Sequence, residues 1–126
     1  MDSRAPSPLN ASEIASIRAA IEDERARAAA RVSALERDLA DIVASSEASP
    51  PDDEHDPEGA TIGFERAQVS ALLDQGRAHL DELDRAESSL RRGDYGICNG
   101  CGRAIGVERL LARPAAVSCV DCARRS

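Results

Sequence analysis

Apolar residues recur at steps of three and four along the first third of the chain. Asn10 or Ser12 can cap a helix at the start of this pattern, and Asn10 with Glu13 has the spacing of a capping box. Such a stripe is typical of a helix that packs along a narrow seam, as in a coiled coil. The stripe consists of Ile14, Ile17, Ile21, Ala28, Val32, Leu35, Leu39 and Ile42, with Glu24 in its one gap.

A proline-rich segment interrupts the pattern midway along the chain. Pro50, Pro51 and Pro57 each disfavour helix before them. Asp56 followed by Pro57 is typical of a new helix start, and residues 91–93 supply two arginines and a glycine that favour a helix end. Between these points a second stripe consists of Val69, Leu72, Leu73, Gly76, Leu80, Leu83, Ala86 and Leu90.

The two stripes predict helices of similar length on either side of one loop. Each has about 30 residues, hence a length of ~45 Å at the usual rise per residue. Folding back on the loop buries both stripes and makes an antiparallel coiled-coil hairpin. The alternative is that each helix pairs with another chain in a dimeric coiled coil. The proline-rich break favours the hairpin, and we expect a monomer.

The last quarter of the chain holds four cysteines in two C-x2-C pairs, with seventeen residues between the pairs. This spacing is typical of four-cysteine zinc sites, and Gly100 and Gly102 permit a tight turn around the second sulfur. Four sulfurs close the coordination of zinc, so the site would hold a fold together and not catalyse. A redox-active pair would need a βαβ setting and one pair. The predicted ligands of one structural zinc ion are Cys98, Cys101, Cys119 and Cys122.

These elements predict an all-α chain with a small zinc finger. We expect a flexible tail at residues 1–11, the hairpin at 12–92 with an acidic tip loop at 47–59, and a zinc-finger domain at 93–126. Little apolar surface is available to the last of these, so zinc is expected to supply much of its folding free energy.

Composition narrows the possible partners. Aromatic residues are limited to Phe64 and Tyr95, which favours a thin helical layer filled by aliphatic side chains. The formal charge is −7, and four thiolates around one zinc ion would add a further −2, so direct sequence-specific DNA binding is not expected. Residues 1–90 hold 9 Arg against 20 acids (−11), and residues 91–126 hold 7 Arg against 3 acids (+4). The absence of Lys indicates a GC-rich, bacterial genome.

No segment has the ~20 apolar residues of a membrane span, and the first ten residues lack the apolar core of a signal peptide. We therefore expect a cytoplasmic protein with no membrane partner. The reducing cytoplasm also favours metal binding over disulfides for the four cysteines.

Five carboxylates crowd into seven residues of the predicted tip loop, with His55 among them. One interpretation is a solvated loop in which Asp56 caps a helix. The spacing does not fit an EF-hand. The other interpretation is that carboxylates at the end of a stiff hairpin act near a metal ion or a basic surface of a partner. The residues alone leave both open. The carboxylates are Asp52, Asp53, Glu54, Asp56 and Glu58.

The segment 94–122, DYGICNGCGRAIGVERLLARPAAVSCVDC, resembles the finger of the DksA/TraR family of RNA polymerase regulators. The match covers both cysteine pairs, the I-G-x-x-R-L of residues 105–110, the A-R-P of residues 112–114 and the final C-x-D-C. The resemblance implies a coiled coil whose acidic tip enters the secondary channel of RNA polymerase. It also implies a regulator of initiation and open-complex stability, not an enzyme.

The chain departs from the family pattern at two places. The family tip reads D-x-x-D-x-A, and here Asp53 and Asp56 match whereas Glu58 replaces the alanine. In the best-known members the alarmone ppGpp binds through basic residues. Arg113 matches one of them, but Ala123 and Glu82 occupy the other positions, so we expect weak or no ppGpp dependence. The resemblance thus implies a polymerase-active tip of Asp53, Glu54, Asp56 and Glu58, and docking or nucleotide contacts from Arg91, Arg92, Arg109 and Arg113.

Two other classes of function are compatible with a zinc module on a hairpin. One is a zinc-dependent redox-sensing or DNA-binding module, which predicts zinc loss with peroxide or a steep salt dependence of DNA binding. The other is a structural coiled-coil adaptor, which predicts a stable dimer.

Overall fold

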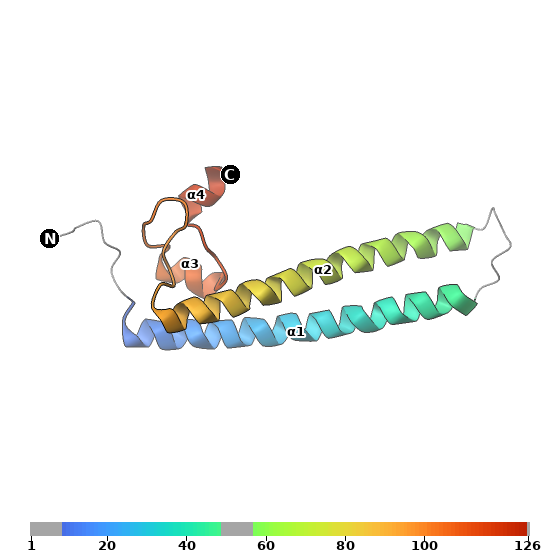
Figure 1. Ribbon diagram of the computed structural model, residues 1–126, viewed down its shortest axis with the longest axis horizontal. Coiled ribbons are helices and arrows are strands. Elements are labelled where there is room, and N and C mark those ends of the chain that lie inside the picture. The colour runs from blue at the N-terminus through green and yellow to red at the C-terminus, as the bar shows by residue number, and fades with distance from the viewer. Residues whose placement is uncertain (1–8, 49–56, 126) are drawn as a thin grey trace. The chain divides into compact units, whose positions relative to one another are not determined.

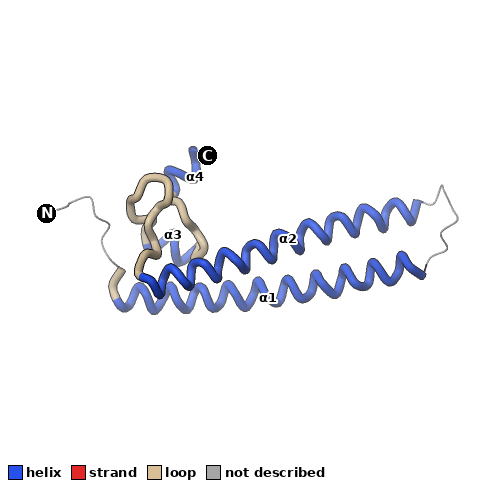
Figure 2. The backbone as a smooth tube through the Cα atoms, viewed as in Figure 1, coloured by secondary structure: helices blue, strands red, loops and turns tan. Residues whose placement is uncertain are grey.

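The computed structural model describes residues 9–48 and 57–125 of the 126-residue chain. The described part is helical and contains no strand, apart from one isolated β-bridge between Ile97 and Ala104. The helices are α1 (Ala11–Ala48), α2 (Pro57–Arg92), α3 (Val107–Ala112) and α4 (Val120–Arg125), which Figure 1 labels. Figure 2 shows the loops that lead into α3 and α4. None of these helices is long and apolar enough to cross a membrane.

Local signals in the sequence set the ends of the long helices. The Asn10 N–H donates to Glu13 Oε1 at 2.9 Å and the Glu13 N–H donates to Asn10 Oδ1 at 2.8 Å, which is the predicted capping box. At the C-terminal end of α2, Gly93 has a φ of 88°, and the N–H groups of Gly93 and Asp94 both donate to the Ser89 carbonyl. This glycine therefore ends α2 as predicted.

Both long helices exceed their predicted length of about 30 residues. α1 has 38 residues and α2 has 36. α2 begins at Pro57, as Asp56–Pro57 predicted, although its first stripe residue is Val69. In the intervening turns Ile62 is half-buried one heptad before Val69, and the predicted stripe did not include it.

The described residues of the range 27–80 form one compact unit in which a segment of α1 runs antiparallel to a segment of α2 (Figure 1). The buried side chains among them are Ala28, Val32 and Leu73. At Gly76 the helices approach so closely that an added Cβ would lie 2.9 Å from Val32 Cγ2. The Arg77 Nη2 pairs with Glu36 Oε2 at 2.9 Å across the helices. This unit is a narrow coiled-coil seam, as the stripes predicted.

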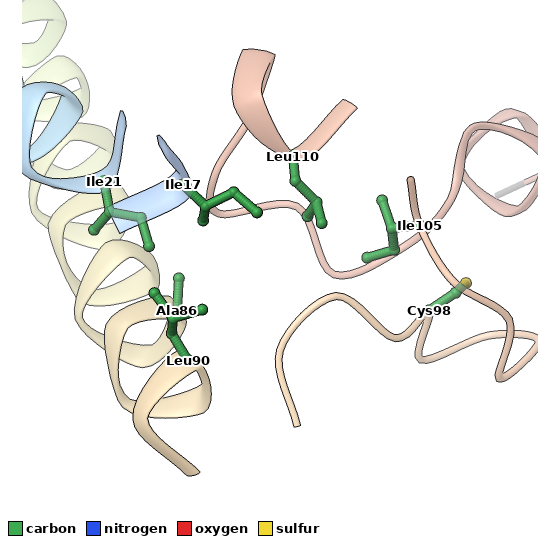
Figure 3. Close-up of a cluster of buried hydrophobic side chains, with 7 residues drawn as sticks. All are labelled: Ile17, Ile21, Ala86, Leu90, Cys98, Ile105 and Leu110. Atoms are coloured by element: carbon green, nitrogen blue, oxygen red, sulfur yellow. The ribbon is translucent and has the colours of Figure 1, made fainter. Parts of the chain in front are cut away.

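The second compact unit joins residues 9–26 to residues 81–125. Its core gathers side chains from the start of α1, the end of α2 and the zinc-finger segment, and Figure 3 shows seven of them facing one another. Leu9 packs against this core and α1 begins at Ala11, so residues 9–11 belong to this unit. The other residues of the predicted tail, 1–8, lie outside the described residues. The buried core residues are Ile17, Ile21, Leu83, Ala86, Leu90, Cys98, Ile105 and Leu110.

Candidate zinc centre

The first cysteine pair lies in a tight hairpin turn that follows α2. The Cys98 N–H donates to the Arg103 carbonyl at 2.8 Å, and the Gly102 N–H donates back to the Cys98 carbonyl at 2.9 Å. Gly102 has a φ of 75°, in the left-handed region that favours glycine. The turn therefore points both sulfurs of the pair toward one place, as the sequence predicted.

The second pair stands at the start of α4. Cys119 directly precedes the helix, and the Ala123 N–H donates to its carbonyl at 2.9 Å. The loop before it is tied to the first pair, because the Asn99 N–H donates to the Val117 carbonyl at 2.8 Å. The fold thus brings together two pairs that are far apart in the chain.

The four cysteine sulfurs lie within 4.8 Å of one another. The Cys101 and Cys119 sulfurs are 3.9 Å apart. A tetrahedral zinc ion with Zn–S bonds of about 2.3 Å would separate its sulfurs by about 3.8 Å, so the cluster fits one ion. Space around it is limited: a Cβ added at Gly100 would lie 3.1 Å from the Cys122 sulfur.

Backbone amides surround the buried sulfur of Cys98. The N–H groups of Cys119 and Gly100 approach it at 3.2 and 3.3 Å. The Cys119 N–H is the main cause of a pKa of about 6 for the Cys98 thiol, and the Cys101 and Gly100 amides act in the same direction against an opposing effect of burial. Cys98 is therefore prepared to bind metal as a thiolate.

The pKa of the Cys122 thiol shows how neighbouring cysteines disfavour a thiolate. The Arg125 guanidinium, which donates to its sulfur at 3.6 Å, lowers its pKa, whereas the neighbouring Cys119 and Cys98 groups raise it, and the balance is a pKa of about 11. Several thiolates packed this closely repel one another. A cation among them removes that penalty, so the donor set favours a bound metal ion.

Two arginines near the cluster were not assigned to it from the sequence. Arg125 lies one helical turn beyond Cys122, and that spacing is the signal that would have identified it. Arg109 was predicted as a docking or nucleotide contact. It is half-buried, and its Nε donates to the Ser118 carbonyl at 2.9 Å, beside Cys119. No local sequence signal marks this contact, because it joins residues nine positions apart across a loop.

The other predicted site residues do not join the cluster. Arg91, Arg92 and Arg113 are exposed. Arg91 lies 4.0 Å from Glu87, and Arg92 lies 3.4 Å from Asp94. The tip residues Asp53, Glu54 and Asp56 lie outside the described residues, and Glu58 falls in the first turn of α2.

Comparison with known proteins agrees with this geometry. The family model described as the prokaryotic dksA/traR C4-type zinc finger matches residues 93–126. A C4 zinc finger and the clustered sulfurs together assign one structural zinc ion as the cofactor. With four sulfur ligands this ion has no open position, so it stabilises the fold.

Curated relatives match a segment of 49 residues of the chain. The "RNA polymerase-binding transcription factor DksA" of Haemophilus influenzae is 39% identical over 49 residues, which are 39% of this chain and 34% of that protein. The protein of the same name from Escherichia coli is 37% identical over 49 residues, 39% of this chain and 32% of that protein. The match thus spans about a third of these relatives' length.

The solved structures extend the likeness over the hairpin. The structure of transcription factor DksA2 from Pseudomonas aeruginosa superposes with a TM-score of 0.74 and is 31% identical in sequence. The match covers 92% of this chain and 84% of that one. Since both the zinc finger and the helices before it are shared, the chain belongs to the DksA/TraR family of C4-type zinc-finger proteins.

Proposed function

We propose that this chain binds RNA polymerase in the cytoplasm and regulates transcription without catalysing a reaction. The observation that carries this proposal is the likeness to DksA2 over 92% of the chain, which includes the hairpin as well as the zinc finger. The names of the curated relatives, which are RNA polymerase-binding transcription factors, support the same partner.

In this proposal the tip acids act inside the secondary channel of the polymerase. Asp53 and Asp56 would reach toward the active centre, with Glu54 and Glu58 adding negative charge beside them. Carboxylates there compete for contacts with mobile catalytic elements or change the electric field around the catalytic magnesium. Such contacts shift the balance between closed and open complexes, and so change initiation without breaking a bond.

We assign docking on RNA polymerase to exposed arginines in and next to the zinc-finger segment of residues 93–126. Arg91 pairs with the half-buried Glu87, and Arg92 pairs with the exposed Asp94. Both arginines are themselves exposed, and ion pairs in contact with solvent contribute little free energy, so both can exchange them for a partner's carboxylates. Arg113 is exposed, and its side chain has no polar partner among the residues that the structure describes. Because Glu82 and Ala123 stand where the family has basic residues, we propose weak or no dependence on ppGpp.

The test is binding of the zinc-loaded protein to the core RNA polymerase of its host, followed by open-complex lifetime. Asp53→Asn with Asp56→Asn removes the two tip charges. Asp74→Asn with Asp81→Asn is a matched control that removes two exposed helix charges, neither of which has an ion-pair partner in the described ranges. We expect all three proteins to bind, and only the tip variant to lose the effect on lifetime.

Two results would contradict the proposal. Absence of binding by the unmodified protein at micromolar concentration would remove RNA polymerase as the partner. Equal loss of the lifetime effect in the tip variant and in the helix control would remove the tip from the mechanism.

A further inference from the structure

Arg109 and Cys98 contact opposite ends of one peptide group. The Arg109 Nε donates to the Ser118 carbonyl oxygen at 2.9 Å. The Cys119 N–H, which belongs to the same peptide unit as that carbonyl, donates to the Cys98 sulfur at 3.2 Å. Because a peptide unit is planar and rigid, fixing its carbonyl also fixes the direction of its N–H.

Both ends of this connection are anchored in the core. Arg109 stands next to Leu110 in α3, and the Leu110 side chain is 1% exposed. Cys98 is likewise 1% exposed and belongs to the same core cluster (Figure 3). The peptide unit between Ser118 and Cys119 is therefore held between the buried Cys98 and Arg109, which is half-buried and lies next to the buried Leu110.

The charge of Arg109 also polarises the Ser118–Cys119 peptide. A charged guanidinium that donates to a carbonyl makes a strong hydrogen bond and polarises the amide. A polarised amide is a better donor through its N–H, since hydrogen bonds in a chain strengthen one another. The Cys119 N–H lies 3.2 Å from the Cys98 sulfur, so this amide donates directly to a predicted zinc ligand.

We propose that Arg109 is a positioning residue of the zinc site, which acts through the Ser118–Cys119 peptide on the Cys98 sulfur and raises the affinity for zinc. It contacts no sulfur itself in the described structure. Groups that orient metal ligands from outside the first coordination shell typically change metal affinity by about 10- to 100-fold. This inference does not depend on RNA polymerase being the partner.

The experiment measures zinc affinity by competition with a chromogenic chelator for the full chain. Arg109→Met keeps most of the aliphatic stem and removes the donor. Arg109→Lys keeps the charge without the planar fork of donors. Arg113→Met is the matched control, because Arg113 follows the same helix and its exposed side chain has no polar partner among the described residues. Helical ellipticity of each zinc-saturated variant confirms that it folds.

A second readout separates positioning from general loosening of the fold. In the Co²⁺-loaded protein, a sulfur that loses a hydrogen bond gives up electron density more easily. The sulfur-to-cobalt charge-transfer band then moves to lower energy. We expect Arg109→Met and Arg109→Lys to weaken zinc binding about 10- to 100-fold and to shift this band. Arg113→Met should do neither.

Three outcomes would overturn the proposal. The first is an unchanged zinc affinity in Arg109→Met. The second is weaker zinc binding with no shift of the cobalt band, which would indicate lost packing alone. The third is full recovery of both readouts in Arg109→Lys, which would show that any cation at this position is sufficient and that the arrangement of the arginine donors has no role. If Arg109→Met does not fold even with excess zinc, Arg109→Lys decides between these outcomes.

Discussion

The two compact units of the chain bury their apolar residues in different ways. The unit of residues 27–80 has a one-dimensional seam, in which the buried side chains are Ala28, Val32 and Leu73. The unit that contains the zinc finger has a three-dimensional core, with Ile17, Leu83 and Leu110 no more than 1% exposed, and a sulfur cluster beside it.

This difference shows how one sequence can use two sources of stability. A seam between two helices depends on regular spacing and close approach, and each residue of it adds a modest amount. A short segment rich in loops cannot bury enough apolar surface by itself, so it depends on a shared core and on the metal. The two units should therefore respond to different perturbations.

The largest expected effect is removal of zinc by a chelator. Zinc sites of this kind contribute roughly 10 kcal/mol or more, so the finger segment should lose its structure while the seam of residues 27–80 keeps much of its helix. Tyr95 is the only tyrosine and the chain has no tryptophan, so tyrosine fluorescence reports on the finger and ellipticity reports on the helices. Recovery on adding zinc is the control. An unchanged tyrosine signal after complete metal removal would contradict the prediction.

The next largest effect is expected from a substitution in the core of the unit that contains the zinc finger. Leu110→Ala should lower the free energy of unfolding by about 2–5 kcal/mol, because it leaves a cavity at a side chain that is 1% exposed. Leu111→Ala, the neighbouring change in the same helix, removes a side chain that is 41% exposed and should cost far less. Urea denaturation of the zinc-loaded proteins measures both. Equal costs would mean that α3 is not anchored through Leu110.

A smaller effect tests close approach in the seam. Gly63→Ala adds a methyl group where nothing lies within 4 Å, so it should stabilise α2 by up to about 1 kcal/mol through helix propensity. Gly76→Ala places its Cβ 2.9 Å from Val32 Cγ2, and the stiff β-branched valine cannot easily move away. We expect a loss of about 1–3 kcal/mol in urea denaturation. Adding Val32→Ala to Gly76→Ala should relieve the clash and restore part of the lost stability. If the Gly76→Ala protein is as stable as the Gly63→Ala protein, the predicted close contact between the helices at Gly76 is wrong.

The smallest effect concerns pH. The Tyr95 hydroxyl donates to the Pro114 carbonyl at 2.8 Å, and burial raises the pKa of Tyr95 to about 12 from 10.0. Because this pKa is higher in the folded state, the protonated Tyr95 hydroxyl adds to the free energy of unfolding. That stabilisation is fully present below the unfolded pKa of 10.0 and is lost as pH rises through about 12. Absorbance of tyrosinate should therefore rise above pH 10, later than in the urea-unfolded chain. Tyr95→Phe should lack this alkaline loss of stability, and coincident titration of the folded and unfolded chains would contradict the assignment.

Much of the fold followed from local patterns. The two apolar stripes predicted the seams, since every stripe residue is buried or half-buried. Asn10 with Glu13 predicted the start of α1, and Gly93 the end of α2. Helix lengths were underestimated. In α2 the stripe was started at Val69, whereas the half-buried Ile62 lies one heptad earlier, and the six residues between them are exposed and give no periodic signal.

The zinc ligands could also be predicted by spacing alone. Two C-x2-C pairs specify their donors because each pair makes its own tight turn, whatever lies between the pairs. By themselves, then, the residues determined the helical hairpin, the four-sulfur donor set and the uneven charge of the two ends.

Only the tertiary structure decided how the finger is supported. It buried Cys98 against Ile105 and Leu110, gave the Ser118–Cys119 peptide its two partners, and placed Arg109 beside the metal site, a contact that the sequence did not predict. The physical reason is that hydrogen bonds across loops depend on the direction of individual peptide planes. Periodicity and spacing describe regular helices and turns, whereas those directions arise only when distant segments pack together.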